Sequence, residues 1–265
     1  MIEASEVLSI NPEEIYLSKK RTNRAVAQQR DPRGLEDNTI SFNKYASQRR
    51  SVNLIPKSLK QEEYIDLLLN EDLKIVFATG PAGTGKTMLA MMAAIKAFKE
   101  GLVSKIVLTR PAVGVDDEQH GFLPGTINEK MEPWTRPLFD VMHEYWSPKE
   151  TARMLEEQII EISPLAYMRG RTFKGAYIIA DEMQNATPSQ MKMLLTRLGQ
   201  DSKMVVTGDT RQADRKEMDN GLLDFKRLVD AYTEKSQFVA GVEFGGKDIQ
   251  RHPVVAEVLR IYKEI

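Results

Sequence analysis

The segment of this chain that most constrains its fold is Gly80-Pro81-Ala82-Gly83-Thr84-Gly85-Lys86-Thr87. It follows an apolar β-type run, Leu73 to Thr79, and precedes a helical pattern that extends from Met88 to Lys99. A glycine-rich loop with the pattern G-x-x-x-x-G-K-[ST], placed between a strand and a helix, is typical of a phosphate-binding loop. The segment therefore predicts a strand–loop–helix unit of an α/β fold, and we include Met88 among the residues expected to contact the ligand.

Each fixed position of this loop has a physical reason. Gly80, Gly83 and Gly85 allow backbone conformations in which successive N–H groups face phosphate oxygens, and the following helix N-terminus adds partial positive charge. Lys86 supplies a cation for the β- and γ-phosphates, and the Thr87 hydroxyl is a ligand for Mg²⁺. The loop therefore predicts binding of ATP or GTP together with Mg²⁺.

A second signal follows the apolar run Ala176 to Ala180, where Asp181 and Glu182 come directly after the predicted strand. Open α/β sheets bind their ligands at the carboxyl ends of the strands, so both carboxylates are expected beside the loop. Asp181 is the predicted second Mg²⁺ ligand, and Glu182 is the predicted general base for hydrolysis. An apolar strand that ends in Asp-Glu is common by itself, and its weight comes from its combination with the loop.

A third signal is the apolar run Lys203 to Thr207, which leads into Gly208 and Asp209, with Gln212 three residues further on. An amide both donates and accepts hydrogen bonds, so Gln212 can contact the γ-phosphate and the attacking water together. We predict Gln212 as a catalytic residue that reports whether ATP has been cleaved. The alternative is a polar turn without a catalytic role.

Residues 58–265 alternate strand-like and helical patterns and are predicted to form one domain. Further strands are expected at Lys105 to Thr109 and Phe238 to Phe244, and further helices at Asn128 to Tyr145, Pro188 to Leu198 and Pro253 to Tyr262. Strands that are apolar throughout indicate burial on both faces. This predicts a mostly parallel sheet flanked by helices.

Residues 1–57 are polar and lack sustained periodicity, and they are predicted to form a separate polar arm. Between Lys19 and Arg33, six basic residues face a single acidic one, Asp31. Such a segment is either a solvated, partly flexible arm or one that contacts a phosphate backbone or a neighbouring subunit.

Composition sets the outer limits. The chain has 265 residues, 42% hydrophobic and 28% charged, which fits one α/β domain with an accessory segment. Without cysteine, disulfides and Cys-based metal sites are excluded, and a cytoplasmic location is expected. No apolar run reaches the ~20 residues that span a bilayer, so no membrane partner is expected. The net charge of −1 neither supports nor excludes contact with nucleic acid, which must rest on a local patch.

Several segments of residues 58–265, in this order along the chain, resemble the PhoH family, whose core is related to superfamily 1 helicases. Besides the loop, they are Leu108–Val113, Gly121–Gly125, Pro164–Phe173, Asp181–Asn185, Gln190–Met193, Val205–Asp209 and Arg251–Val254. The resemblance implies a single RecA-like P-loop NTPase domain that hydrolyses ATP with Mg²⁺.

The resemblance also implies roles for five residues. Gln61 looks like the upstream glutamine that reads adenine, which favours ATP over GTP; the alternative is an exposed helix glutamine. Thr109, Arg110 and Pro111 look like the loop through which related motors contact a nucleic-acid strand. Arg251 looks like the late-motif arginine that touches the γ-phosphate.

We therefore expect ATP hydrolysis coupled to binding or unwinding of single-stranded RNA or DNA. The alternative is an ATP-driven conformational switch or assembly scaffold without strand translocation. Helicases of this type close the ATP site between two domains, and this chain has room for one. We expect a homo-oligomer, a ring of six, in which Arg251, or else Arg169 or Arg171, completes the site of the next subunit. Alternatively, Arg251 acts within its own chain.

Overall fold

The computed structural model describes residues 51–111, 127–210, 220–232, 236–250 and 253–262. The chain divides after Ser41, and all the described residues belong to the second unit, Phe42–Ile265. Most of the predicted basic arm, residues 1–50, therefore lies outside the described residues.

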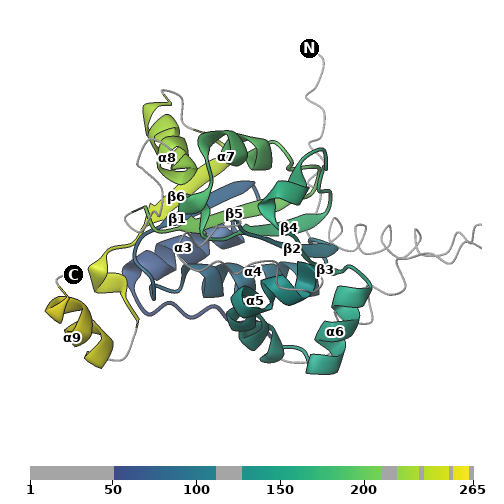
Figure 1. Cartoon of the computed structure of the whole chain (residues 1–265), viewed down its shortest axis with the longest axis horizontal. Coiled ribbons are helices and arrows are strands. Elements are labelled where there is room, and N and C mark those ends of the chain that lie inside the picture. Colours follow the sequence, from purple (N-terminus) through teal and green to yellow (C-terminus); the bar gives the residue numbers. More distant parts are fainter. Residues whose placement is uncertain (1–50, 112–126, 211–219, 233–235, 251–252, 263–265) are drawn as a thin grey trace, which may run out of the picture. The chain divides into compact units, whose positions relative to one another are not determined.

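A six-stranded parallel sheet forms the centre of the second unit (Figure 1). Its strands are β1 (Ile75–Thr79), β2 (Lys105–Thr109), β3 (Ile160–Ile162), β4 (Ala176–Ala180), β5 (Lys203–Gly208) and β6 (Val239–Glu243). Their order across the sheet is β3-β2-β4-β5-β1-β6, so β5 separates the strand before the glycine-rich loop from the strand before Asp181. Because all strands run in one direction, the segments that follow them meet at a single edge of the sheet.

Helices connect and flank the strands. They are α3 (Leu59–Leu69), α4 (Lys86–Lys99), α5 (Ile127–His143), α6 (Pro148–Glu156), α7 (Pro188–Leu195), α8 (Gly221–Ala231) and α9 (Pro253–Ile261), with the short 3₁₀ helices η2 (Leu165–Met168), η3 (Met183–Asn185) and η5 (Gly246–Asp248). Ser147 and Thr187 start α6 and α7 with capping boxes, each followed by a proline at the start of the helix. None of the helices in the described ranges combines the length and the apolar character needed to cross a bilayer.

Helices cover both faces of the sheet (Figure 1): α3, α4 and α5 lie on one face, and α7 and α8 lie on the other. Successive side chains of β1 alternate between these layers, since Val76 and Ala78 pack into the first apolar cluster and Phe77 into the second. Each face thus buries its own core, which explains why the strands are apolar at nearly every position.

The predicted α/β class, with a parallel sheet flanked by helices, is confirmed. Of the five predicted strands, Lys105–Thr109 and Ala176–Ala180 have the predicted bounds, and the others differ by one or two residues at their ends. The strand β3, which has only three residues, and the helices α3, α6 and α8 were not predicted. The starts of α6 and α8 are marked by the cap residues Ser147 and Asn220 rather than by a long periodic pattern.

Lys203, the first residue of β5, ties the sheet to the end of α3. Its Nζ donates hydrogen bonds to the carbonyl oxygens of Leu67, Leu68 and Asn70 at 2.9, 2.7 and 2.8 Å. Carbonyl groups at the end of a helix have no donors within the helix, so the amine satisfies three of them. Burial lowers the pKa of Lys203 to about 8, so the charged form still dominates at neutral pH.

We expect Lys203→Met to lower the free energy of unfolding by about 2 to 3 kcal/mol, because three carbonyl oxygens lose their donor in a largely buried site. In a domain of this size, that lowers the thermal midpoint by about 4 to 12 °C. Thermal unfolding followed by circular dichroism measures the change. Lys149→Met, at an exposed position of α6, is the control and is expected to stay within about 0.5 kcal/mol of the parent. Equal midpoints for both variants would show that this cap does not stabilise the fold.

Candidate functional site

The glycine-rich loop joins β1 to α4 in the conformation that its glycines require. Gly80, Gly83 and Gly85 have φ angles of 133°, 83° and 84°, a region that favours glycine. At Gly80 space is also limiting, because a Cβ atom would lie 2.4 Å from the carbonyl oxygen of Phe244. The loop ends where α4 begins at Lys86, so the unpaired N–H groups of the helix N-terminus lie at the loop.

Lys86 is folded back onto this loop. Its Nζ donates to the carbonyl oxygens of Gly80 and Pro81 at 2.6 and 2.8 Å, and to Thr84 Oγ1 at 3.3 Å. These three acceptors are neutral oxygens, whereas the oxygens of a polyphosphate carry negative charge. A bound phosphate would therefore offer the ammonium group charged acceptors in place of these neutral ones.

Gln61, in the first turn of α3, binds the backbone of the loop. Its Nε2 donates to the carbonyl oxygen of Thr84 at 2.9 Å, and its Oε1 accepts from the N–H of Lys57 at 2.8 Å. The side chain is only 2% exposed, so the alternative of an exposed helix glutamine is wrong. Contact between Gln61 and adenine stays a prediction, because both polar ends of this amide are bonded to the backbone of the chain.

Asp181 follows β4 and lies against the start of α4. Its Oδ1 accepts a hydrogen bond from the Thr87 hydroxyl at 2.9 Å, across 94 positions of sequence, and another from the Thr207 hydroxyl in β5. Its backbone N–H donates to the carbonyl oxygen of Thr109 at 2.9 Å. The site thus sets one carboxylate and one hydroxyl side by side, which fits Mg²⁺, a cation that combines one or two protein oxygens with phosphates and water.

Glu182 begins the tight turn η3, with a φ angle of 54°. Left-handed backbone is uncommon for a residue other than glycine, and such conformations cluster at functional sites. The turn sends the chain away from the strand directly after Asp181. It thereby places two consecutive carboxylates, Asp181 and Glu182, on the same cavity.

Gln184 connects this turn to the segment after β5. Its Nε2 donates to Glu182 Oε2 at 2.5 Å, and its Oε1 accepts from the N–H of Asp209 at 3.1 Å. The amide is 2% exposed. The roles of Gln184 and Thr207 were not predicted from sequence, although an amide two residues after Glu182 was a usable signal for Gln184.

The loop and the two carboxylates border a cavity of about 240 Å³. Its lining residues are Ala82, Gly83, Gly85, Lys86, Thr87, Met88, Asp181, Glu182, Gly208 and Asp209. Four other predicted contacts, Gln61, Gly80, Pro81 and Thr84, are outside this lining and shape the loop through hydrogen bonds instead. A larger cavity of about 570 Å³, around Lys203 and Tyr177, contains none of the predicted site residues.

Three residues at the end of β2 are predicted to contact a nucleic-acid strand, and of these only Arg110 has a partly exposed side chain. Thr109 and Pro111 are buried. Gln212 and Arg251 lie outside the described residues. Gln250, which precedes Arg251, donates its N–H to the carbonyl oxygen of Gly83 at 2.8 Å, so this segment lies at the loop of its own chain.

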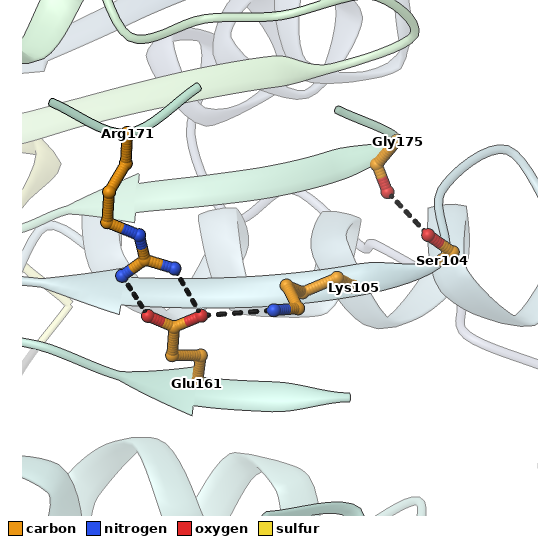
Figure 2. Close-up of polar contacts among 5 residues, drawn as sticks. All are labelled: Ser104, Lys105, Glu161, Arg171 and Gly175. Carbon is orange, nitrogen blue, oxygen red and sulfur yellow. Dashed lines mark hydrogen bonds and ion pairs between the residues drawn. The ribbon is translucent and has the colours of Figure 1, made fainter. Parts of the chain in front are cut away.

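Arg171, one of the arginines considered for a neighbouring site, is engaged within its own chain. Figure 2 shows its guanidinium in a two-pronged pair with Glu161 of β3, with Nη2 2.9 Å from Oε2. Lys105 of β2 approaches the same carboxylate at 3.1 Å. Hydrogen bonds from Arg171 hold the pKa of Glu161 below its usual value, so this cluster stabilises the fold at neutral pH and loses that contribution only in acid.

Comparison with known proteins gives one consistent family. A family model described as PhoH-like protein matches residues 53–263. A PhoH-like protein of Bacillus subtilis (strain 168) is 48% identical over 207 residues, which are 78% of this chain and 63% of the relative. Protein PhoH of Escherichia coli (strain K12) is 40% identical over 217 residues, 81% of this chain and 59% of the relative. The chain thus spans about three fifths of the length of these relatives.

Among solved structures, the UvsW helicase from bacteriophage T4 aligns with 87% of this chain and 77% of its own, at 12% identity and a TM-score of 0.42. At that level the likeness adds nothing to the family assignment.

If the chain hydrolyses ATP as the sequence predicts, we expect Gln184→Met to slow that reaction about 10- to 100-fold, because it removes the hydrogen bond from Gln184 to Glu182. ATP affinity should stay within about twofold, since Gln184 does not line the cavity. Single-turnover hydrolysis and calorimetric titration separate the two effects. Gln190→Met, which removes an amide from the capping box of α7, is the control. If both variants hydrolyse ATP at the parent rate, Gln184 has no part in the reaction.

Proposed function

Because the chain belongs to the PhoH-like protein family, we propose that it is a Mg²⁺-dependent ATPase whose hydrolysis is coupled to single-stranded RNA or DNA. One observation carries the ATPase proposal. The Thr87 hydroxyl and the Asp181 carboxylate, 94 positions apart in sequence, meet at 2.9 Å beside Lys86. A glycine-rich turn without a role in phosphate binding would not require a carboxylate beside its Lys-Thr pair.

In this proposal, the triphosphate lies along the loop, with backbone N–H groups and the α4 N-terminus facing its oxygens. Lys86 exchanges its bonds to Gly80 and Pro81 for bonds to the β- and γ-phosphates. Thr87 and Asp181 hold Mg²⁺, which when bound neutralises charge on the phosphates. ATP is proposed over GTP on the position of Gln61, whose amide has to release Thr84 or Lys57 before it can pair with adenine.

Glu182 is the proposed general base. It accepts a proton from water as the water oxygen bonds to the γ-phosphorus and the bond to ADP breaks. The amide of Gln184 donates to Glu182 Oε2 at 2.5 Å and accepts from the N–H of Asp209 at 3.1 Å. It thereby links the proposed base to the segment that leads to Gln212. Gln212, three residues after Asp209, is the proposed γ-phosphate sensor, and Arg251 is proposed to neutralise charge on the γ-phosphate.

We also propose that the chain assembles as a homo-oligomer, a ring of six. The described residues form one P-loop sheet, whereas sites of this kind close between two such domains. The hydrogen bond from Gln250 to Gly83 favours the alternative in which Arg251 serves its own site. A neighbouring subunit would then close the cavity without donating Arg251.

A second candidate function is an ATP-driven conformational switch or assembly scaffold that moves no strand. The burial of Thr109 and Pro111 favours it, because two of the three predicted strand contacts have no free surface. ATPase rates measured with and without single-stranded RNA and DNA distinguish the two functions. Stimulation supports the strand-coupled ATPase, and an unchanged rate with every polynucleotide supports the switch.

We expect Lys86→Ala to abolish ATP binding and Glu182→Gln to bind Mg-ATP with near-parent affinity while hydrolysing it about 10² to 10⁴ times more slowly. The first removes the phosphate cation, and the second keeps the shape of the base but not its proton affinity. Calorimetric titration and a phosphate-release assay measure the two quantities. Parent-rate turnover by Glu182→Gln would place the base elsewhere, and unchanged binding by Lys86→Ala would contradict the phosphate site.

A mixing experiment tests the oligomer and the side on which Arg251 acts. Size-exclusion chromatography with light scattering should give the mass of six chains. Arg251→Ala and Lys86→Ala chains, inactive alone, are then unfolded and refolded together. If Arg251 serves its own site, as we expect, the mixture stays inactive. Recovery of activity would show that Arg251 acts on the neighbouring subunit, and a strictly monomeric, fully active chain would rule out the ring.

A further inference from the structure

The turn η2, which follows β3, presents an aromatic and a basic side chain to solvent. Tyr167 is 59% exposed and Arg169 is exposed as well. Their neighbours Leu165 and Met168 are 1% and 0% exposed and pack into the apolar cluster under α7 and α8. The two buried side chains anchor the turn, so the exposed ones have a fixed base.

Backbone contacts hold the turn at both ends. The N–H of Leu165 donates to the carbonyl oxygen of Arg110 at 3.0 Å, and the N–H of Tyr167 donates to that of Pro164 at 2.9 Å. Gly170 has a φ angle of 79°, which reverses the chain at a position suited to glycine. Arg171 then pairs with Glu161 (Figure 2), so the segment is fixed on both sides of Arg169.

The local charge of this segment is positive although the chain as a whole carries −1. From Ser163 to Lys174 the sequence has three basic residues and no acidic one. The nearby carboxylate of Glu161 is already shared by Arg171 and Lys105. Among the described residues no carboxylate pairs with Arg169, so its charge is directed to solvent.

From this arrangement, and resting on the proposed function, we propose that Tyr167 and Arg169 form a contact surface for single-stranded nucleic acid. An exposed aromatic ring on a rigid turn can stack on an unpaired base, whose face is hidden in a duplex. A neighbouring guanidinium binds the phosphate that follows, with two donors in a plane. Arg110, half-exposed at the base of the same turn, extends the surface.

This surface is linked to the nucleotide site through consecutive peptide groups of one strand end. The carbonyl of Arg110 accepts from Leu165 of the turn, and the carbonyl of Thr109 accepts from Asp181, the proposed Mg²⁺ ligand. A shift at the end of β2 therefore reaches both hydrogen bonds. We expect the affinity for a strand to differ between the nucleotide-free chain and the chain bound to a non-hydrolysable ATP analogue.

Fluorescence anisotropy of labelled single-stranded RNA and DNA oligonucleotides of mixed sequence tests the surface in the full chain. We expect Tyr167→Ala to weaken binding about 10-fold and Tyr167→Phe to retain it, because the ring stacks. Arg169→Ala should weaken binding about 5- to 10-fold and reduce the salt dependence by about one phosphate contact. The matched controls are Arg227→Ala, at an exposed arginine of α8, and Tyr232→Ala, at the exposed tyrosine directly after α8. Both should bind as the parent does.

The outcomes separate this inference from the proposed function. If the parent binds no strand while it hydrolyses ATP, the strand-coupled function and this surface both fail, and the switch remains. If the parent binds but the Tyr167 and Arg169 variants bind equally well, only this surface is wrong. Loss of self-association in the variants, with strand binding intact, would identify the turn as a contact between subunits instead. Thermal midpoints close to the parent's show that the variants fold.

Discussion

The buried carboxylate of Asp181 ties together the parts of the molecule on which the site depends. It accepts hydrogen bonds from Thr87 at the start of α4 and from Thr207 in β5, and its own N–H binds Thr109 at the end of β2. A charged group that is 8% exposed is costly to bury without such partners. The strand order supplies them, because β4 lies between β2 and β5, and β1, the strand before the glycine-rich loop, lies on the other side of β5. The register of the sheet therefore also fixes the geometry of the proposed Mg²⁺ site.

Lys86 and Asp181, the oppositely charged groups of this site, both make hydrogen bonds to neutral groups. Lys86 is paired with neutral oxygens of its own loop, whereas Asp181 is paired with hydroxyl groups. A phosphate would give the ammonium group of Lys86 charged acceptors, and a divalent cation would give the carboxylate of Asp181 a charged partner. A site with this pattern is satisfied enough to fold and still gains from binding. The left-handed Glu182 adds a carboxylate to the same edge without a second strand.

The local parts of this site could be predicted from sequence, and the contacts between distant parts could not. The loop, Asp181 and Glu182 each carry a short pattern whose chemistry is evident within a few residues. Five of the six strands, and the helices α4, α5, α7 and α9, followed from the periodicity of their own residues, whereas β3, α3, α6 and α8 did not. Gln184 and the support role of Gln61 depend on which strand lies beside which, since their partners are 25 and 23 positions away. Hydrogen bonds of that range leave no spacing in the sequence to detect.

The loop itself is held by segments that come from three directions. Gln61 of α3 binds Thr84, the carbonyl of Gly208 at the end of β5 accepts from Gly80, and Gln250 after η5 binds Gly83. A ligand that changes the backbone of the loop must therefore change at least one of these contacts. The segment that leads to Arg251 is among them, and the segment that leads to Gln212 begins at Gly208 and Asp209. On the proposed function, nucleotide binding at the loop would act, through these single hydrogen bonds, on the segments that lead to Gln212, the predicted γ-phosphate sensor, and to Arg251, predicted to touch the γ-phosphate.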